Sequence, residues 1–114
     1  MNDLWTAVVW LAVLSTASQA VPDPTALVQE ADRLAWLRAW TSAEPLYIDA
    51  KIIFAARGNE RDALYAEVGA LRGRLPRMSV PAASAQLASY LELPIVKADD
   101  RLRLRVLTVH PNGC

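Results

Sequence analysis

The chain has 114 residues, of which 54% are hydrophobic, and its twelve basic and twelve acidic side chains cancel. This length supports one small domain, and the apolar content excludes a disordered chain. The balanced charge excludes an overall field that would attract nucleic acid or anionic lipid. Because Cys114 is the one cysteine, no disulfide can form within the chain, and packing must stabilise the fold.

The first twenty residues have the layout of a secretory signal peptide. Residues 4–14 (LWTAVVWLAVL) form an uncharged apolar run, and Ser18 and Ala20 supply the small residues of a cleavage site. Asp3 departs from the layout, because such leaders usually begin with basic residues. An uncleaved membrane anchor and a misplaced start codon are the alternatives, but the run is short for a span that needs about 20 residues. We expect an exported protein, periplasmic or secreted, that is membrane-anchored only if the leader is retained.

A linker at residues 21–24 is predicted to precede the first helix of the mature chain. Its two prolines interrupt any helix that continues from the leader, and Asp23 before Pro24 makes a good N-cap. The helix is expected to extend to about Trp40. We interpret Trp36 and Trp40, one turn apart on this helix, as packing residues, with a ligand-stacking platform as the alternative. The predicted buried stripe contains Leu27, Ala31, Leu34 and Ala35, with Trp36 as a further candidate.

Residues 42–75 are predicted to form two helices joined by a tight reversal. Ser42 is a candidate N-cap of the second helix, and Pro45 falls in its first turn, where a missing N–H costs little. Gly58 supplies a left-handed residue that ends this helix, and Asn59 is placed to cap the third. Pro76 ends the third helix. Six apolar residues of the second helix recur at helical spacing: Ala43, Leu46, Tyr47, Ala50, Ile53 and Phe54.

The alternation of helices and turns favours a tetratricopeptide-like repeat. In the third helix, Tyr65, Val68 and Gly69 match the W-x-x-L-G opening of that repeat, and Ala31 takes the equivalent small position in the first helix. The separation of Ala31 and Gly69 is 38 residues, compared with about 34 in the standard repeat. The second helix matches the pattern A-x-x-x-F-x-x-A. Packing roles between helices are therefore predicted for Ala31, Leu34, Ala43, Tyr47, Ala50, Tyr65, Val68 and Gly69.

Two more helices are predicted beyond a proline-bracketed loop at residues 76–81. The fourth runs from about Pro81 to Leu91. Residues 101–107 alternate basic and apolar side chains, which alone favours a strand. However, Asp99 and Asp100 are typical of a helix N-terminus, and no second strand is predicted that would pair with this segment. We interpret it as a helix whose apolar stripe has no following helix to cover it; the stripe consists of Leu102, Val106 and Val109.

The predicted fold class is therefore all-α. It consists of a short antiparallel array of about five helices over residues 25–109, after an N-terminal leader helix and before a disordered tail at residues 110–114. The uncovered stripe of the last helix predicts self-association or marginal stability. It also indicates that the repeat array is unfinished, because the last helix has no following partner.

Three segments resemble the tetratricopeptide-like N-terminal region of large bacterial proteins that carry a C-terminal CHAT domain, a caspase-like peptidase fold. They are residues 31–37 (ADRLAWL), 58–69 (GNERDALYAEVG) and 99–104 (DDRLRL), with Asp62 where the family usually has Asn. The resemblance implies a helical repeat that accompanies a catalytic domain. The catalytic His and Cys of that family lie in a separate domain of some hundreds of residues, for which this chain has no room.

No catalytic or metal-binding constellation is found in the sequence. His110 and Cys114 lie in a Pro-Gly tail where nothing orients one against the other, and one His with one Cys does not make a zinc site. No glycine-rich phosphate loop is present. Two basic clusters are interpreted as solvated faces, with a site for phosphate or an acidic peptide as the alternative. They are Arg72, Arg74 and Arg77, and Arg101, Arg103 and Arg105.

The sequence therefore predicts a non-catalytic, exported helical-repeat module that binds a protein or peptide, or a missing C-terminal domain. We expect it to be a truncated N-terminal part of a larger bacterial signalling protein. A membrane-tethered structural subunit and a remnant of a CHAT-type hydrolase are the alternatives. No cofactor, metal or nucleic acid is expected as a ligand. The predicted partner surface consists of Trp36, Trp40, Leu102, Val106 and Val109.

Overall fold

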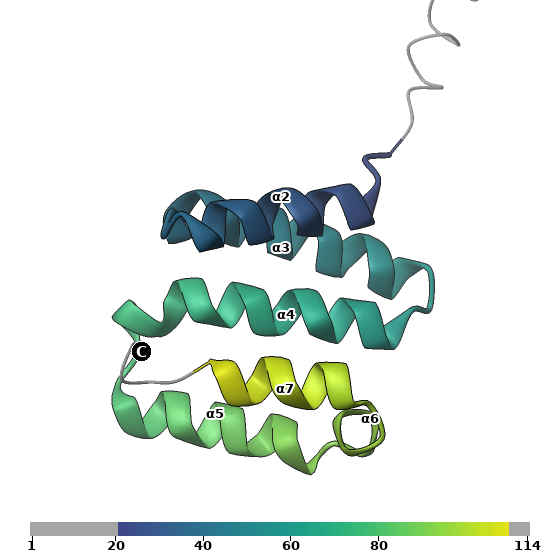
Figure 1. The fold of residues 1–114 in the computed structure, drawn as a ribbon. Coiled ribbons are helices and arrows are strands. Elements are labelled where there is room, and N and C mark those ends of the chain that lie inside the picture. The colour runs from purple at the N-terminus through teal and green to yellow at the C-terminus, as the bar shows by residue number, and fades with distance from the viewer. Residues whose placement is uncertain (1–20, 110–114) are drawn as a thin grey trace, which may run out of the picture.

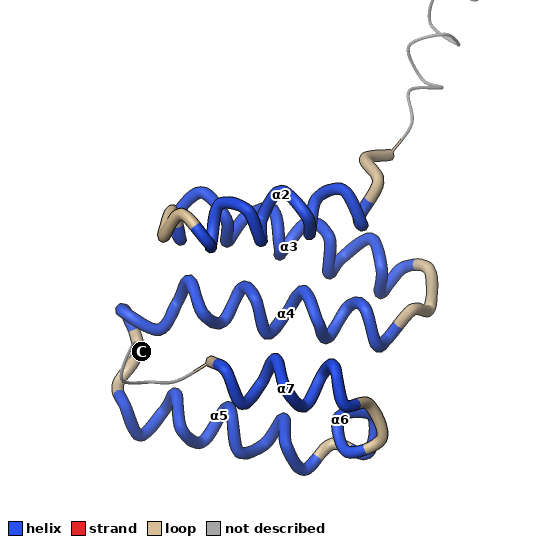
Figure 2. The backbone as a smooth tube through the Cα atoms, viewed as in Figure 1, coloured by secondary structure: helices blue, strands red, loops and turns tan. Residues whose placement is uncertain are grey.

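A computed structural model describes residues 21–109, which form helices and no strand (Figures 1 and 2). The all-α class is confirmed, and the segment that alternates basic and apolar residues is helical. The predicted leader at residues 1–20 and tail at residues 110–114 lie outside the described residues. The elements are α2 (Pro24–Trp36), α3 (Trp40–Ala56), α4 (Glu60–Arg74), the 3₁₀ turn η1 (Leu75–Arg77), α5 (Val80–Glu92), α6 (Pro94–Lys97) and α7 (Asp100–Thr108).

The helices lie side by side, in the spatial order α2, α3, α4, α7 and α5 (Figure 1). α3 packs against α2 and α4, whereas α7 packs against α4 and α5. The short helix α6, which the sequence analysis did not predict, connects α5 to α7 and buries Val96 completely. One apolar cluster lies among α2, α3 and α4, and a second lies among α4, α5, α6 and α7. The two clusters share α4, which is therefore the central helix of the fold.

The reversal between α3 and α4 is the one that the sequence predicts. Gly58 has a φ of 74°, and its N–H donates to the carbonyl of Ala55 at 3.0 Å. The next N–H, that of Asn59, donates to Phe54 at 2.9 Å, which completes a Schellman motif. The side chain of Asn59 then caps α4 by accepting from the N–H of Asp62 at 3.2 Å. Helix end and helix start thus share one three-residue connection.

The reversal between α2 and α3 has the same hydrogen-bond pattern without a glycine. Arg38 occupies the left-handed position with a φ of 63°, and its N–H donates to Ala35 at 2.9 Å. The N–H of Ala39 donates to Leu34 at 2.8 Å. An arginine in the sequence does not indicate a left-handed backbone conformation, because glycine adopts that conformation far more readily. The sequence therefore missed this helix end.

Two expectations about this region are consequently wrong. The first helix ends at Trp36 instead of continuing to Trp40, so the two tryptophans belong to different helices and do not share a face of one helix. Ser42 lies inside α3 and does not cap it, because α3 begins at Trp40 behind Ala39. The predicted cap at Asp23 is present, since its side chain accepts from the N–H of Thr25 at 3.1 Å.

The expectation of an uncovered stripe on the last helix is also wrong. Leu102 and Val106 are each 1% exposed, and Val109 is 4% exposed. α7 lies between α4 and α5, so the stripe packs into the second apolar cluster, against residues such as Val68 and Leu71. Covering the stripe removes the basis on which self-association was predicted.

The residues predicted to pack between helices lie in or beside the two apolar clusters. Six of the eight are buried, whereas Leu34 and Tyr65 are partly buried against the core. Gly69 occupies the tightest place. A Cβ atom at this position would lie 2.7 Å from Cε1 of Tyr47 and 2.5 Å from Nη2 of Arg105. Neither separation is compatible with van der Waals contact, so α3 and α7 approach α4 this closely only because residue 69 lacks a side chain.

We expect Gly69→Ala to destabilise the protein by about 1–3 kcal/mol through overpacking, although alanine is the better helix former. Gly73→Ala is the matched control, because its Cβ would meet Glu44 Cβ at 3.2 Å, a contact that a small shift relieves. Urea unfolding monitored by circular dichroism measures both variants. Equal effects of the two substitutions would contradict the role given to Gly69.

Replacing Arg38 by glycine should raise the free energy of unfolding by about 0.5–1 kcal/mol. A left-handed conformation costs an L-residue about 1–2 kcal/mol, and the greater freedom of glycine in the unfolded chain offsets part of the gain. Arg57→Gly is the control, since Arg57 has a φ of −89° and gains nothing from glycine. A lower urea midpoint for Arg38→Gly would refute the expectation.

Candidate functional site

A groove of about 540 Å³ opens where the α2–α3 connection faces the C-terminal ends of α4 and α7. A volume of this size is typical of ligand sites. Its floor and walls come from α2, the α2–α3 connection, α3, α4, η1 and the C-terminal part of α7. The lining residues are Asp32, Ala35, Trp36, Arg38, Trp40, Tyr47, Gly69, Arg72, Leu75, Pro76, Arg105 and Val109.

The floor of the groove is organised by Arg105 of α7. Its Nε donates to the backbone carbonyl of Tyr65 at 2.7 Å, and its Nη2 donates to Oδ1 of Asp32 at 3.4 Å. The guanidinium carbon lies 3.7 Å from the centroid of the Tyr65 ring and 5.4 Å from that of Tyr47. The Tyr47 hydroxyl donates to the same Asp32 oxygen. These contacts join α2, α3, α4 and α7 beside the space left by Gly69.

The hydroxyl of Tyr47 is a neutral donor in this network. Burial, together with the hydrogen bond to Asp32, raises the pKa of Tyr47 well above its ordinary value, and the opposing effect of Arg105 is smaller. A neutral phenol, an arginine and one carboxylate that hold one another in place form a structural network. They do not include a nucleophile activated by an adjacent base.

The rim of the groove carries two tryptophans and two exposed arginines. Trp36 is 86% exposed, whereas Trp40 is partly buried beneath Arg72, whose guanidinium carbon lies 4.5 Å from the ring centroid. Arg38 lies on the connection between the tryptophans and is exposed. Within residues 21–109, neither Arg38 nor Arg72 forms an ion pair. The rim therefore combines apolar aromatic surface with available positive charge.

The structure separates the six arginines of the two basic clusters. Arg77 donates to both carboxylate oxygens of Glu44 at 2.9 Å, and Arg103 pairs with Asp100 on its own helix. Arg105 is used in the floor of the groove. Of these six side chains, Arg72 alone lines the groove as a cation without an acidic partner among the described residues.

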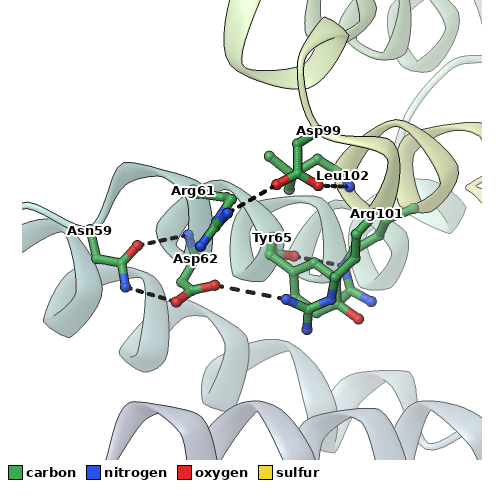
Figure 3. Close-up of polar contacts among 8 residues, drawn as sticks. Asn59, Arg61, Asp62, Tyr65, Asp99, Arg101 and Leu102 are labelled. Atoms are coloured by element: carbon green, nitrogen blue, oxygen red, sulfur yellow. Dashed lines mark hydrogen bonds and ion pairs between the residues drawn. The ribbon is translucent and has the colours of Figure 1, made fainter.

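At the other end of the molecule, two reciprocal ion pairs join the N-termini of α4 and α7 (Figure 3). In each pair an arginine from one helix lies close to an aspartate at the N-terminus of the other. Asp99 caps α7 by accepting from the N–H of Leu102 at 3.1 Å, and it also lies 3.4 Å from Arg61 of α4. In return Arg101 of α7 lies 3.9 Å from Asp62 in the first turn of α4 and 4.0 Å from the centroid of the Tyr65 ring. The arginines of both pairs are largely exposed, so the pairs orient the two helices more than they stabilise them.

The predicted site residues are thus divided by the fold. Trp36 and Trp40 lie on the rim of the groove, and Val109 lies in its wall. Leu102 and Val106 are buried and present no surface to a partner. Asp32 and Arg38 also line the groove, although neither was predicted as a site residue. The arginine inside the segment WLRAW, between two tryptophans, was the one indication that this connection lies at a site.

Residues 21–109 contain no group of three His, Cys, Asp or Glu side chains that would hold a metal ion. In that range, no helix is both long enough and apolar enough to cross a membrane. His110 and Cys114 lie outside the described residues. No family model, curated protein or solved structure matches this chain.

Tyr47→Phe should reduce the loss of stability at alkaline pH. The pKa of Tyr47 is raised in the folded state, so its contribution is complete below about pH 10, where the unfolded phenol is still protonated. Above that pH the unfolded chain ionises more readily, and stability falls. Phenylalanine removes this dependence and costs about 1 kcal/mol at neutral pH through the lost hydrogen bond.

Urea midpoints of both proteins at about pH 8 and about pH 11 test this. Burial also raises the pKa of Tyr90, but Tyr90 is present in both proteins, so their difference isolates Tyr47. Identical pH dependence in the two proteins would show that Tyr47 ionises as an ordinary tyrosine.

Proposed function

We propose that this chain is a helical-repeat module that binds a peptide segment of another protein in the groove. The observation that carries the proposal is the exposed ring of Trp36 on the rim. A tryptophan that is 86% exposed leaves a large apolar surface in water, and tryptophans in such positions commonly anchor a partner. Trp40 and the apolar walls extend this surface into the groove.

The spacing of the helices supports a tetratricopeptide-like array. α2, α4 and α7 begin at residues 24, 60 and 100, so successive starts are 36 and 40 residues apart, close to the period of about 34 in that repeat. Small residues lie at the close contacts, with Ala31 fully buried and Gly69 against Tyr47. Arrays of this kind bind partners along a face shared by several repeats. The resemblance to repeats that accompany CHAT domains agrees with a binding role.

Export is part of the proposal and rests on residues 1–20. A module released from its leader would meet its partner outside the cytoplasm. The chemistry of the groove favours binding over catalysis, because its polar floor is occupied by contacts within the protein.

Selection of a random peptide library displayed on phage tests the proposal. Peptides enriched on the wild-type protein should share a pattern, and their affinity should fall about tenfold or more for Trp36→Ala, as for a binding hot spot. Ile52→Ala is the matched control, because Ile52 is 60% exposed on α3 and does not line the groove. Failure to enrich any peptide, or equal binding by Trp36→Ala and wild type, would overturn the proposal.

A further inference from the structure

We infer that the groove recognises an acidic peptide segment, in which two carboxylates are bound by Arg38 and Arg72 and an intervening apolar side chain packs against the tryptophans. This rests on the proposed function, since it specifies the chemistry of the peptide that occupies the same groove.

The distribution of charge in a neutral protein supports an acidic ligand. The groove is lined by three arginines and one carboxylate, that of Asp32. One oxygen of Asp32 already accepts from the Tyr47 hydroxyl and from Arg105. The floor is therefore internally balanced, and Arg38 and Arg72 give the open part of the groove a positive charge.

Arg38 and Arg72 differ from most arginines of the protein, which form ion pairs with carboxylates of residues 21–109. Six of the ten arginines in residues 21–109 have a carboxylate oxygen within 4.0 Å. Among those residues, the arginines without such a partner are Arg38, Arg57, Arg72 and Arg74. Two of these four line the same groove. Exposed arginines that converge on an apolar groove are suited to a carboxylate, which the planar guanidinium binds through two parallel hydrogen bonds.

The fold defines the side-chain position of Arg72 and the backbone conformation of Arg38. The guanidinium carbon of Arg72 lies over the ring of Trp40, 4.5 Å from its centroid, and this cation–π contact holds the cation beside the groove. Arg38 is the one residue other than glycine with a positive φ among the described residues, and it occupies a position where glycine would be less strained. Retaining an arginine there places a cation on the short connection between Trp36 and Trp40.

The apolar part of the lining favours a peptide over a simple anion. Ala35, Leu75, Pro76 and Val109 line the groove together with the tryptophans. Inorganic phosphate or polyphosphate would contact the arginines and leave these side chains unused. A peptide with an aromatic or aliphatic residue between acidic ones would use both kinds of surface.

Fluorescence anisotropy with three labelled peptides tests the inference. The probes are fluorescein-Glu-Asp-Phe-Leu-Glu-Asp-amide, its Gln/Asn counterpart and its Lys counterpart. We expect the acidic peptide to bind about tenfold more tightly than the neutral one, and the basic one more weakly still. Affinity for the acidic peptide should decrease as salt is added, because the arginines remain accessible to counterions.

Variants assign the charge effect to the two arginines. Arg38→Gln and Arg72→Gln should each weaken binding of the acidic peptide about five- to tenfold and leave binding of the neutral peptide unchanged. Arg57→Gln is the matched control, because Arg57 is exposed and without an ion pair among the described residues but lies at the far end of α3. Its affinity should equal that of the wild type.

The outcomes separate this inference from the proposed function. Equal binding of the acidic and neutral peptides, with both dependent on Trp36, would overturn the inference and leave the proposed function standing. Absence of binding by all three peptides and by a selected library would overturn both. If tripolyphosphate displaces the acidic peptide at equal concentration, and replacing Phe and Leu by Gly in the peptide changes nothing, the site takes anions and the peptide assignment is wrong.

Discussion

The contact of Arg105 with the face of α4 at Gly69 is the constraint on which the arrangement of helices depends. A guanidinium can lie against this helix only where no Cβ is present, and there it reaches a backbone carbonyl of α4 and a carboxylate of α2 at once. Because Tyr47 approaches the same glycine from α3, one missing side chain allows both α3 and α7 to pack closely against α4. The rest of the packing follows from this close approach.

The groove is a consequence of this packing. Its floor consists of the residues that join the helices, and the polar groups of these residues are occupied by one another. Its rim consists of residues on a connection and at a helix end, which the packing does not need. We therefore expect substitutions of Trp36, Arg38 and Arg72 to leave the fold intact.

Charged side chains contribute orientation more than stability in this small domain. The arginines that join the N-termini of α4 and α7, and Arg77 in its pair with Glu44, are largely exposed, and ion pairs with exposed partners are worth little. The free energy of folding comes instead from two apolar clusters that share α4. Substitutions in α4 are therefore expected to affect both halves of the array.

The sequence by itself determined the all-α class, the helix caps at Asp23 and Asn59 and the end of α3 at Gly58, because periodicity, capping and glycine act over a few residues. It also predicted the small residue at position 69 as a close contact. Only the tertiary structure decided where α2 ends, because an arginine occupies the left-handed position there. It also decided how α7 is covered, because that depends on the packing of α4 and α5. The tertiary structure alone also decided the groove. Its residues, from Asp32 to Val109, are brought together by packing, and no local sequence pattern links them.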